Sequence, residues 1–478
     1  MTLPPNIETL SRSDLLLLAI ELAQANTELQ TALTELRAEM QSLRAEIAAL
    51  KRAQHRPSAP FSTDERVQHP KKSGRKPGEG IFRHRAAPAE EAYSSPPLEV
   101  PVEPTACPVC GGELETEAEE VVTVTDLPAV VRPVVKADRV QVCRCRTCGQ
   151  AMRGRHPEVA PDQFGATAHR VAERAKASAQ LLHYGVGLPV RKVPRVLQQL
   201  TGLRLTQGAI TQNALRRAAG SVGAAYADLR TGVKDAERVH TDDTGWRIGD
   251  ETAYLQVFET AEASVYQIRP QHRNEEVREV IPSDYPGVMS TDRGKSYDAK
   301  EPLEIKQQKC IGHIQRSTRL VLEQKQGKAR AFGNRLKALL KEATQLWHDY
   351  HAGEVSDFQT QAPALKARIT HHLRIRRLVD EDNQRLLDEL GLHDDRGNLL
   401  RFLDAPRIEP TNNAAGRALR PAVIARKVSH CSKNERGAEA FAAFTSVIRT
   451  MMKKSGASGV VEELCRLFQP TRAPDTPA

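Results

Sequence analysis

Two short stretches of the chain run from apolar residues into carboxylates that stand beside small, turn-forming residues. They are residues 239–246, which include Asp242, and residues 287–292, which end at Asp292. Short apolar runs of this kind are typical of buried strands, so we expect the two aspartates on neighbouring strands at one rim of a sheet. Two carboxylates placed there can share Mg²⁺ ions, and paired metals hold the attacking and leaving oxygens of a phosphodiester. The pattern favours a multidomain α+β protein that processes DNA.

The residues around these acids predict a sheet of mixed direction. The expected strands are residues 239–248, 253–259, 264–269, 287–292 and 305–311, with a short helix over residues 274–281. Three antiparallel strands, a helix and then further buried strands are the order of an RNase H-like fold. In that fold the first acid lies on strand one and the second at the end of strand four, and Asp242 and Asp292 fall at those places.

Length and charge restrict the class of protein. A chain of 478 residues is too long for one core, so we expect three or four folded units. Lys and Arg number 69 against 60 Asp and Glu, a formal charge of +9, which suits a polyanion partner without proving one. Aromatic residues make up only 4%, which argues against binding single strands by base stacking. No apolar run reaches membrane-spanning length and the start is no signal peptide, so we expect a cytoplasmic, nucleoid-associated protein.

Residues 1–55 predict a dimerisation helix. Leucine recurs every seven residues, and a second set of mostly apolar residues falls midway between the leucines. The leucines are Leu15, Leu22, Leu29, Leu36, Leu43 and Leu50, and the second set is Asn26, Leu33, Met40 and Ile47. Leucine at the d positions and a single asparagine at an a position favour a parallel two-stranded coiled coil, which would make the protein a homodimer. One amphipathic helix packed on its own protein is the alternative.

Residues 56–104 predict a flexible linker, because Pro, Ser, Arg, Lys and His dominate and no apolar period persists. Within it, the run that contains Arg75 and Lys76 is basic and contains glycine and proline. Such a run can lie in an A·T-rich minor groove. The alternative is a solvated charged linker with only weak attraction to phosphate.

A cluster of cysteines predicts a zinc ribbon over residues 105–160. The expected ligands are Cys107, Cys110, Cys145 and Cys148. Two C-x-x-C pairs, each followed by glycine, suit tetrahedral coordination of a structural Zn²⁺ by thiolates. In a reducing compartment such clustering favours metal over disulfides. The residues between the pairs are rich in valine, so we expect Cys143 to be a strand residue rather than a fifth ligand.

Residues 165–225 predict consecutive helices joined by short turns. One helix ends at Gly202, and Thr206 caps the next. Helix, glycine-containing turn, helix is the layout of a helix-turn-helix, and an ordinary helical hairpin is the alternative. The residues expected to face a DNA groove are Gln207, Arg216 and Arg217.

The acids belong to a predicted core over residues 235–455. A charged helical stretch, about residues 325–403, reads as an insertion into that core. Its basic face is a candidate DNA contact, although a solvated helix face is the commoner explanation. Residues 456–478 form a C-terminal helix and tail in this interpretation.

The segment that is most diagnostic of a family is residues 409–421, which contains the motif residues Asn412, Asn413, Arg417, Arg420 and Pro421. With Asp242, Asp243, Thr244, Gly245, Trp246 and Asp292, it resembles transposases of the insertion-sequence-66 family. The resemblance runs from the coiled coil through the zinc ribbon to Lys454. It implies a DDE recombinase, whose RNase H-like core uses three metal-binding acids to cut and join transposon ends. Asp242 carries over as the first acid and Asp292 as the second.

The third acid departs from the family pattern. That pattern, Asn-Asn-x-Ala-Glu-Arg, has a glutamate where this chain has Gly416, although Asn412, Asn413 and Arg417 match. An interior glycine weakens a helix by about 1 kcal/mol relative to alanine, and nothing around Gly416 predicts a turn. The simplest interpretation is a lost glutamate. A second departure is Asp243, where the family usually has glutamate.

The resemblance also implies partners and cofactors. They are double-stranded DNA (terminal inverted repeats and target), accessory proteins of the same element, Mg²⁺ or Mn²⁺, and the structural Zn²⁺. The cations expected to hold DNA phosphates are Arg420, Arg426 and Lys427, with structural ion pairs as the alternative. Cys310 and His313 resemble the family's Cys-x-x-His, for which we expect a packing or orienting role. Two other functions stay open: a cleavage-impaired DNA-binding relative, because of Gly416, and a zinc-stabilised coiled-coil transcription factor.

Overall fold

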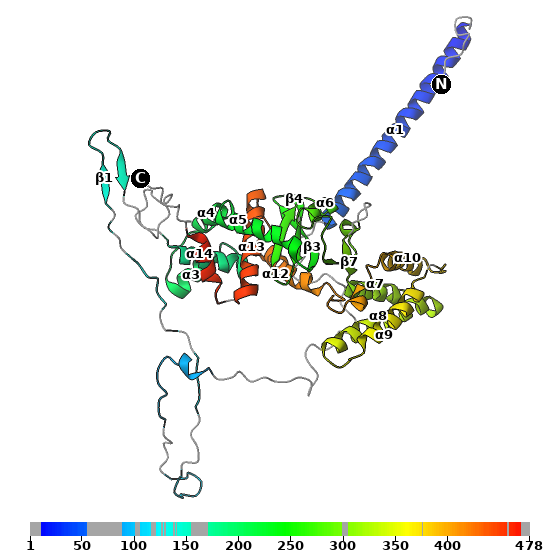
Figure 1. The fold of residues 1–478 in the computed structure, drawn as a ribbon. Helices are drawn as coiled ribbons and strands as arrows, with labels where there is room; N and C mark the ends of the chain where they lie inside the picture. The colour runs from blue at the N-terminus through cyan, green and yellow to red at the C-terminus, as the bar shows by residue number, and fades with distance from the viewer. Residues whose placement is uncertain are drawn as a thin grey trace. The chain divides into compact units, whose positions relative to one another are not determined.

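The structure is a computed structural model of the chain, drawn in Figure 1. It describes residues 11–54, 88–100, 106–115, 121–125, 128, 131–136, 139, 141–153, 171–298, 305–374, 376–456 and 458–469. The chain divides into two units, residues 1–93 and 94–478. Arg75 and Lys76, and most of the predicted linker, lie outside the described residues.

The first unit contains one long helix, α1 (Arg12–Gln54), of 43 residues. Ser11 caps it, since the Ser11 hydroxyl accepts from the Asp14 N–H at 3.2 Å and donates to the Asp14 carboxylate at 2.6 Å. The seam leucines from Leu15 to Leu43 are exposed in the single chain; Leu29 and Leu36 are 63% and 60% exposed. A continuous helix is therefore confirmed, whereas its pairing with a second copy stays a prediction. No described helix, α1 included, is both long and apolar enough to cross a membrane.

A five-stranded sheet forms the centre of the second unit (Figure 1). Its strands are β3 (Arg238–Ile248), β4 (Glu251–Glu259), β5 (Ser264–Arg269), β6 (Val288–Thr291) and β7 (Lys306–Lys309), in the order β5-β4-β3-β6-β7. β3, β4 and β5 pair antiparallel, whereas β6 is parallel to β3 and β7 is parallel to β6. This arrangement confirms the predicted strands and the antiparallel pairing of the first three.

Helices cover both faces of the sheet. On one face, α12 (Asn413–Ser429) and α13 (Glu435–Ser455) pack against side chains such as Trp246. On the other face, α5 (Ser221–Gly232) packs beside a cluster that includes Phe258. Successive residues of a strand point to opposite faces, so every second residue of β3 faces α12.

Helix α13 also covers the edge of the sheet. β5 is the terminal strand on that side, and an edge strand presents unpaired backbone N–H groups. The Ser264 N–H donates to the Thr450 hydroxyl at 3.1 Å, and the Tyr266 N–H donates to the Ser446 hydroxyl at 2.8 Å. Side chains of α13 thus take the place of a further strand.

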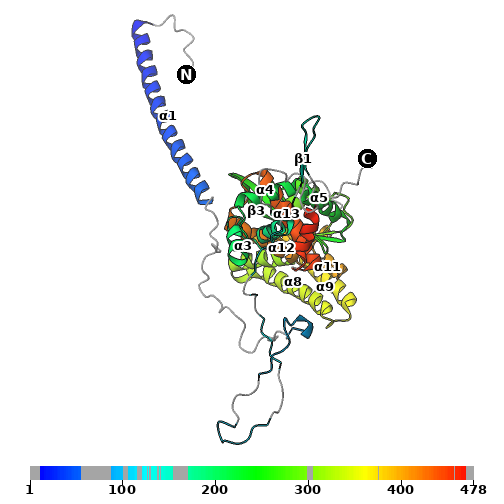
Figure 2. The same ribbon diagram turned by 90° about the vertical axis from the view of Figure 1, so that its left-hand side faces the viewer.

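Beyond β7 the chain forms the helical insertion (Figure 1). The helix α7 (Ile311–Glu323) precedes the predicted stretch, whose helices are α8 (Arg330–His351), α9 (Phe358–His372), α10 (Glu381–Asp395) and α11 (Arg401–Asp404). They share a core of their own, in which Leu336, Leu340 and Ile369 are fully buried. Figure 2 shows α8 and α9 side by side. The predicted helical character of this stretch is confirmed.

Short helices precede the sheet: α2 (Glu173–Gln180), α3 (Val193–Thr201) and α4 (Gln207–Ala218). As predicted, Gly202 ends α3 in the left-handed conformation and the Thr206 hydroxyl caps α4. The sequence does not predict the π-helical turn Leu181–Gly185 that continues α2. A Cβ at Gly185 would lie 3.0 Å from Ile448 Cγ2, so the glycine allows this turn to approach α13. The predicted C-terminal helix is α14 (Val460–Phe468).

Candidate functional site

The two predicted acids lie at the same end of neighbouring parallel strands. The register of β3 and β6 pairs His240 with Ser290. Asp242 lies two residues beyond His240, and Asp292 lies two residues beyond Ser290, directly after the end of β6. The charge of Asp292 acts on Asp242, so the two carboxylates lie near each other. The structure therefore brings together the two acids that are remote in sequence.

Burial and mutual repulsion act on this pair. Burial, followed by the charge of Asp292, raises the pKa of Asp242 to about 6. The Asp243 N–H donates to Asp242 Oδ1 at 2.9 Å, which partly opposes the shift, and the Gly294 N–H donates to Asp292 Oδ1 at 2.7 Å. Two half-buried carboxylates with this repulsion suit a hard divalent cation, and Mg²⁺ is commonly held by one or two carboxylates plus substrate phosphates. The donor set therefore fits Mg²⁺ or Mn²⁺.

Asn412, at the start of α12, joins the site to that helix. It is 3% exposed, and its side-chain N–H donates to the carbonyl of Thr241 at 2.7 Å. Its Oδ1 lies 3.2 Å from His240 Nδ1, and its backbone N–H donates to Cys310 Sγ at 3.1 Å. The first residue of the family motif thus ties together β3, β7 and α12 directly beside Asp242.

Cys310 and His313 form a second pair at this rim. A hydrogen bond to Cys310 raises the pKa of His313, and the charges of Asp242 and Asp292 act in the same direction. Burial tends to raise the pKa of Cys310, but hydrogen bonds from His313 and Asn412 outweigh it, so that pKa is lowered overall. Cys310 is 2% exposed. These contacts support an orienting role for the Cys-x-x-His residues.

Gly416 lies on α12, one helical turn after Asn412. Its φ is not positive, and a Cβ built there would meet no atom within 4 Å. A larger side chain at this exposed position would therefore have room, and Gly416 is not required by a turn or a close approach. Within the described residues, no three or more His, Cys, Asp and Glu side chains lie close enough together to hold a metal ion.

Asp243 shows an interaction that sequence analysis did not find. It points to the opposite face from Asp242, and its Oδ2 lies 3.2 Å from His272 Nδ1. The His272 ring stacks on Tyr254, with ring centroids 4.2 Å apart. Burial raises the pKa of Asp243, and His272 opposes that shift. No local sequence signal links these residues, because they come from three different segments.

The predicted DNA-binding cations differ in their surroundings. Arg420 and Lys427 are exposed on α12. Arg426 instead donates to the Thr244 hydroxyl at 3.1 Å and to the carbonyl of Gly245. Arg426 therefore helps to hold α12 against β3.

The predicted helix-turn-helix residues also differ from one another. Gln207 and Arg216 are exposed on α4. Arg217 lies 3.0 Å from the Glu173 carboxylate, and its guanidinium lies 4.8 Å from the centre of the Phe468 ring. With a side chain only 15% exposed, Arg217 holds α4 against α2 and α14.

The two C-x-x-C pairs fold into matching knuckles. Cys107 N–H donates to a carbonyl five residues on, and Gly111 N–H donates back to the Cys107 carbonyl, both at 2.8 Å. Cys145 and Gly149 repeat the pattern at 2.8 and 3.0 Å, and both glycines have φ of +74°. Backbone N–H groups two and three residues further along lower the pKa of both leading cysteines, that of Cys145 to about 7. N–H groups that stabilise a thiolate suit a metal ligand. Among the described residues, however, no three of these four cysteines lie close enough together to hold a metal ion, so the Zn²⁺ site stays a prediction.

The strands near the second knuckle are β1 (Val142–Arg144) and β2 (Ala151–Arg153), which pair antiparallel. Cys143 lies in β1, as predicted. All eight cysteines are free thiols. The described residues between the two knuckles form no strand before β1, which differs from the strand-rich stretch expected there.

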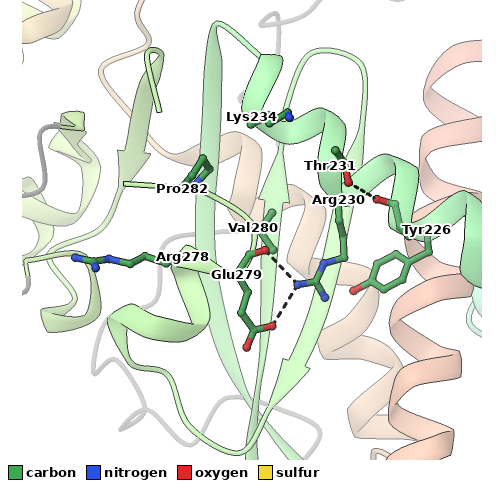
Figure 3. Close-up of a pocket in the computed structure, with 9 residues that line it drawn as sticks. Tyr226, Arg230, Thr231, Lys234, Arg278, Glu279, Val280 and Pro282 are labelled. Carbon is green, nitrogen blue, oxygen red and sulfur yellow. Dashed lines mark hydrogen bonds and ion pairs between the residues drawn. The ribbon is translucent and has the colours of Figure 1, made fainter. Parts of the chain in front are cut away.

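Two hollows lie in the second unit. One, of about 490 Å³, is lined by Arg230, Lys234, Arg278 and Glu279 among others. Figure 3 shows Arg230 reaching Glu279 across it. The other, of about 240 Å³, lies between α12, α13 and the π-helical turn, and Arg420 lines it. None of the lining residues of either hollow belongs to β3 or β6.

Comparison with known proteins agrees with this geometry. The family described as "Transposase IS66 family" matches residues 169–440, which is more than half of the 478 residues. The match includes Asp242, Asp292, Asn412 and Gly416. No curated protein matches the chain. The chain belongs to the IS66 family of transposases.

Proposed function

We propose that this chain is a DNA transposase with an RNase H-like core, in which Asp242 and Asp292 hold divalent cations beside a phosphodiester of the transposon end. The observation that carries the proposal is the parallel pairing of β3 and β6, which ends at His240 and Ser290, two residues before each acid. A cation between the carboxylates would offset the repulsion that helps to raise the pKa of Asp242. The family supports DNA as the substrate.

Each part of the site has a defined task in this proposal. Mg²⁺ or Mn²⁺ bound there would activate the attacking water or 3′-hydroxyl and stabilise the leaving oxygen. Asp242 and Asp292 would determine the position of the cation. Asn412 holds the strand that carries Asp242, through its bond to the Thr241 carbonyl. Arg420 and Lys427, exposed on the same helix, would contact DNA phosphates.

The remaining parts of the chain would assemble the complex on DNA. The zinc knuckles and α4 would grip terminal inverted repeats, with Gln207 and Arg216 as exposed candidates for contact. The exposed leucine seam of α1 would pair two subunits as a parallel coiled coil. The linker that contains Arg75 and Lys76 would add attraction to phosphate.

A second candidate function has an observation of its own in favour. Gly416 supplies no carboxylate, and the described residues contain no cluster of three or more metal-ligating side chains. The chain would then bind transposon ends without cutting them, and would compete with an active relative.

Cleavage of end DNA in Mg²⁺ or Mn²⁺ tests the two functions. The comparison uses the unchanged chain, Gly416→Glu and Gly416→Ala. Both substitutions remove the glycine from a helix, but only glutamate restores an acid, so a gain in cutting confined to Gly416→Glu supports the cleavage-impaired function. Equal, robust cutting by all three would refute our account of Gly416.

Asp292→Asn separates catalysis from binding. We expect it to abolish any cutting while end-DNA affinity stays unchanged, because it removes one carboxylate from the site. Loss of DNA binding as well would mean that Asp292 has a structural role.

A further inference from the structure

Lys309 is a buried cation that the proposed chemistry does not use. It lies on β7 and is 0% exposed. Its Nζ lies 3.0 Å from Asp298 Oδ1 and 3.2 Å from Thr291 Oγ1. A buried ammonium is tolerated only where acceptors surround it, and both acceptors here belong to residues 291–298, the segment that contains the second acid.

The hydroxyl of Thr291 links Lys309 to Asp292 through two hydrogen bonds. An ammonium can only donate, so Thr291 Oγ1 must accept from Lys309 and direct its own hydrogen elsewhere. That hydrogen is donated to the backbone carbonyl of Asp292 at 2.8 Å. The Asp292 carboxylate in turn accepts from the Gly294 N–H at 2.7 Å. Asp292 is thus held both at its backbone and at its side chain.

The same ammonium holds the far end of the segment. Asp298 follows the short helix Lys295–Tyr297, and His393 Nε2, from α10, lies 3.9 Å from its second oxygen. Two further side chains hold the residues before it: Gln307 donates to the Tyr297 carbonyl at 2.8 Å, and Asn274 donates to the Ser296 carbonyl at 2.9 Å. One buried charge therefore closes residues 291–298 into a fixed loop.

We propose that Lys309 is a positioning residue for Asp292: through Thr291 and Asp298 it fixes the backbone from which the second acid reaches the cation. It touches neither the cation nor DNA. Misplacing a reacting group by about 1 Å can reduce a rate by about 100-fold, so such a contact matters without any direct chemistry. A purely structural ion pair, which stabilises the fold but leaves Asp292 unaffected, is the competing explanation.

The first test removes the Thr291 hydroxyl, which links Lys309 to Asp292, and leaves both charges in place. Thr291→Val keeps the shape and removes the hydroxyl, whereas Thr291→Ser keeps the hydroxyl. In the full-length protein, hydrogen–deuterium exchange of the peptide over residues 288–298 should become about tenfold faster in Thr291→Val, the loss expected for one buried hydrogen bond, and stay unchanged in Thr291→Ser. The matched control is Thr450→Val, which removes a buried hydroxyl that bonds Ser264 and should leave this peptide unaffected.

A second measurement is the affinity of the protein for a divalent cation, and it rests on the proposed function. Binding of Mn²⁺, measured by electron paramagnetic resonance, should weaken about 10–100-fold in Thr291→Val, as for loss of a group that orients a ligand. Thr291→Ser and Thr450→Val should bind as the unchanged chain does. Valine and serine variants that behave alike in exchange, or a valine variant with unchanged exchange, would overturn the proposal.

The role of the Lys309 charge is tested with a double substitution that also removes the charge of its partner, Asp298. Lys309→Met alone leaves the half-buried Asp298 carboxylate without its close cation and with only His393 near it, which can prevent folding. The double variant Lys309→Met with Asp298→Asn removes both charges, and it should show the same faster exchange as Thr291→Val. If Asp292→Asn leaves Mn²⁺ binding of the otherwise unchanged chain intact, the proposed metal site fails, while the exchange results still decide the role of Lys309.

Discussion

Asp242, on β3, and Asp292, directly after β6, each lie two residues beyond the last pair of these parallel strands, His240 and Ser290. Strands that run in the same direction end at the same rim of a sheet, so side chains from distant parts of the chain meet there. Burial and the charge of Asp292 raise the pKa of Asp242 to about 6 as a result. The site holds unfavourable charge until a cation or a proton offsets it.

Asp242→Asn should stabilise the fold, and more so at high pH. The folded pKa of about 6 lies above the ordinary value of 3.8, so the ionised carboxylate destabilises the folded state fully above the folded pKa and not at all below the unfolded one. We expect unfolding in urea to require about 1–2 kcal/mol more at pH 8, after allowance for solvent screening, and less at pH 5. The exposed turn variant Asp250→Asn is the control. An equal gain at both pH values would contradict this assignment.

Asn412→Ala should destabilise the protein strongly. It removes the hydrogen bonds to the Thr241 carbonyl and to His240 from a site that is 3% exposed, a loss of about 2–4 kcal/mol. Chemical unfolding measures it. The neighbouring Asn413 is exposed, so Asn413→Ala provides a matched control that should change stability little. Similar effects of the two alanines would show that the motif does not hold α12 to the sheet.

Cys145→Ser should remove bound zinc from the purified protein. The thiolate it replaces is favoured by backbone N–H groups, and a tetrahedral site needs all four ligands. Metal analysis should find about one Zn²⁺ per unchanged chain and none after the substitution. Cys143→Ser lies in the adjacent strand β1 and should leave the zinc content unchanged. Loss of zinc from both variants would indicate that Cys143 is a ligand.

Leu29→Asp should separate the subunits. Leu29 is 63% exposed in the single helix, and a charge at a d position would be buried in a coiled coil. Sedimentation of the full-length protein should show the mass of two chains before the substitution and of one chain after it. Thr31→Asp adds the same charge outside the seam and should leave the dimer intact. A monomeric unchanged chain would refute the predicted pairing.

The sequence was sufficient for the strands and for the pair of acids. β4, β5 and β6 contain short apolar runs bounded by turn residues, so their signal is local, and the order of such runs leaves few sheet topologies open. β7 is polar throughout (Lys306–Lys309), and its prediction depended on the apolar residues that flank it. Gly202 and Thr206 likewise mark the end of α3 and the start of α4 by a local sequence signal. Gly416 was found only because its neighbours fit a family pattern, and the structure adds that no steric demand explains it.

The partners of charged side chains could not be read in the same way. Arg217 and Arg426 look like DNA contacts in sequence, yet one pairs with Glu173 and the other donates to Thr244 and Gly245. Lys309 looks like a surface residue and is fully buried. No neighbouring residue in the sequence indicates which side chains these residues contact.

The sequence by itself determined which segments become strands and helices, and which residue types stand at their ends, because those choices depend on local propensity and spacing. Only the tertiary structure decided which carboxylates, cations and amides meet. Asp298 reaches Lys309, and His272 reaches Asp243, because the sheet brings their segments together. For the fully buried Lys309, burial makes such a contact obligatory, since an unpaired charge inside the protein is unfavourable.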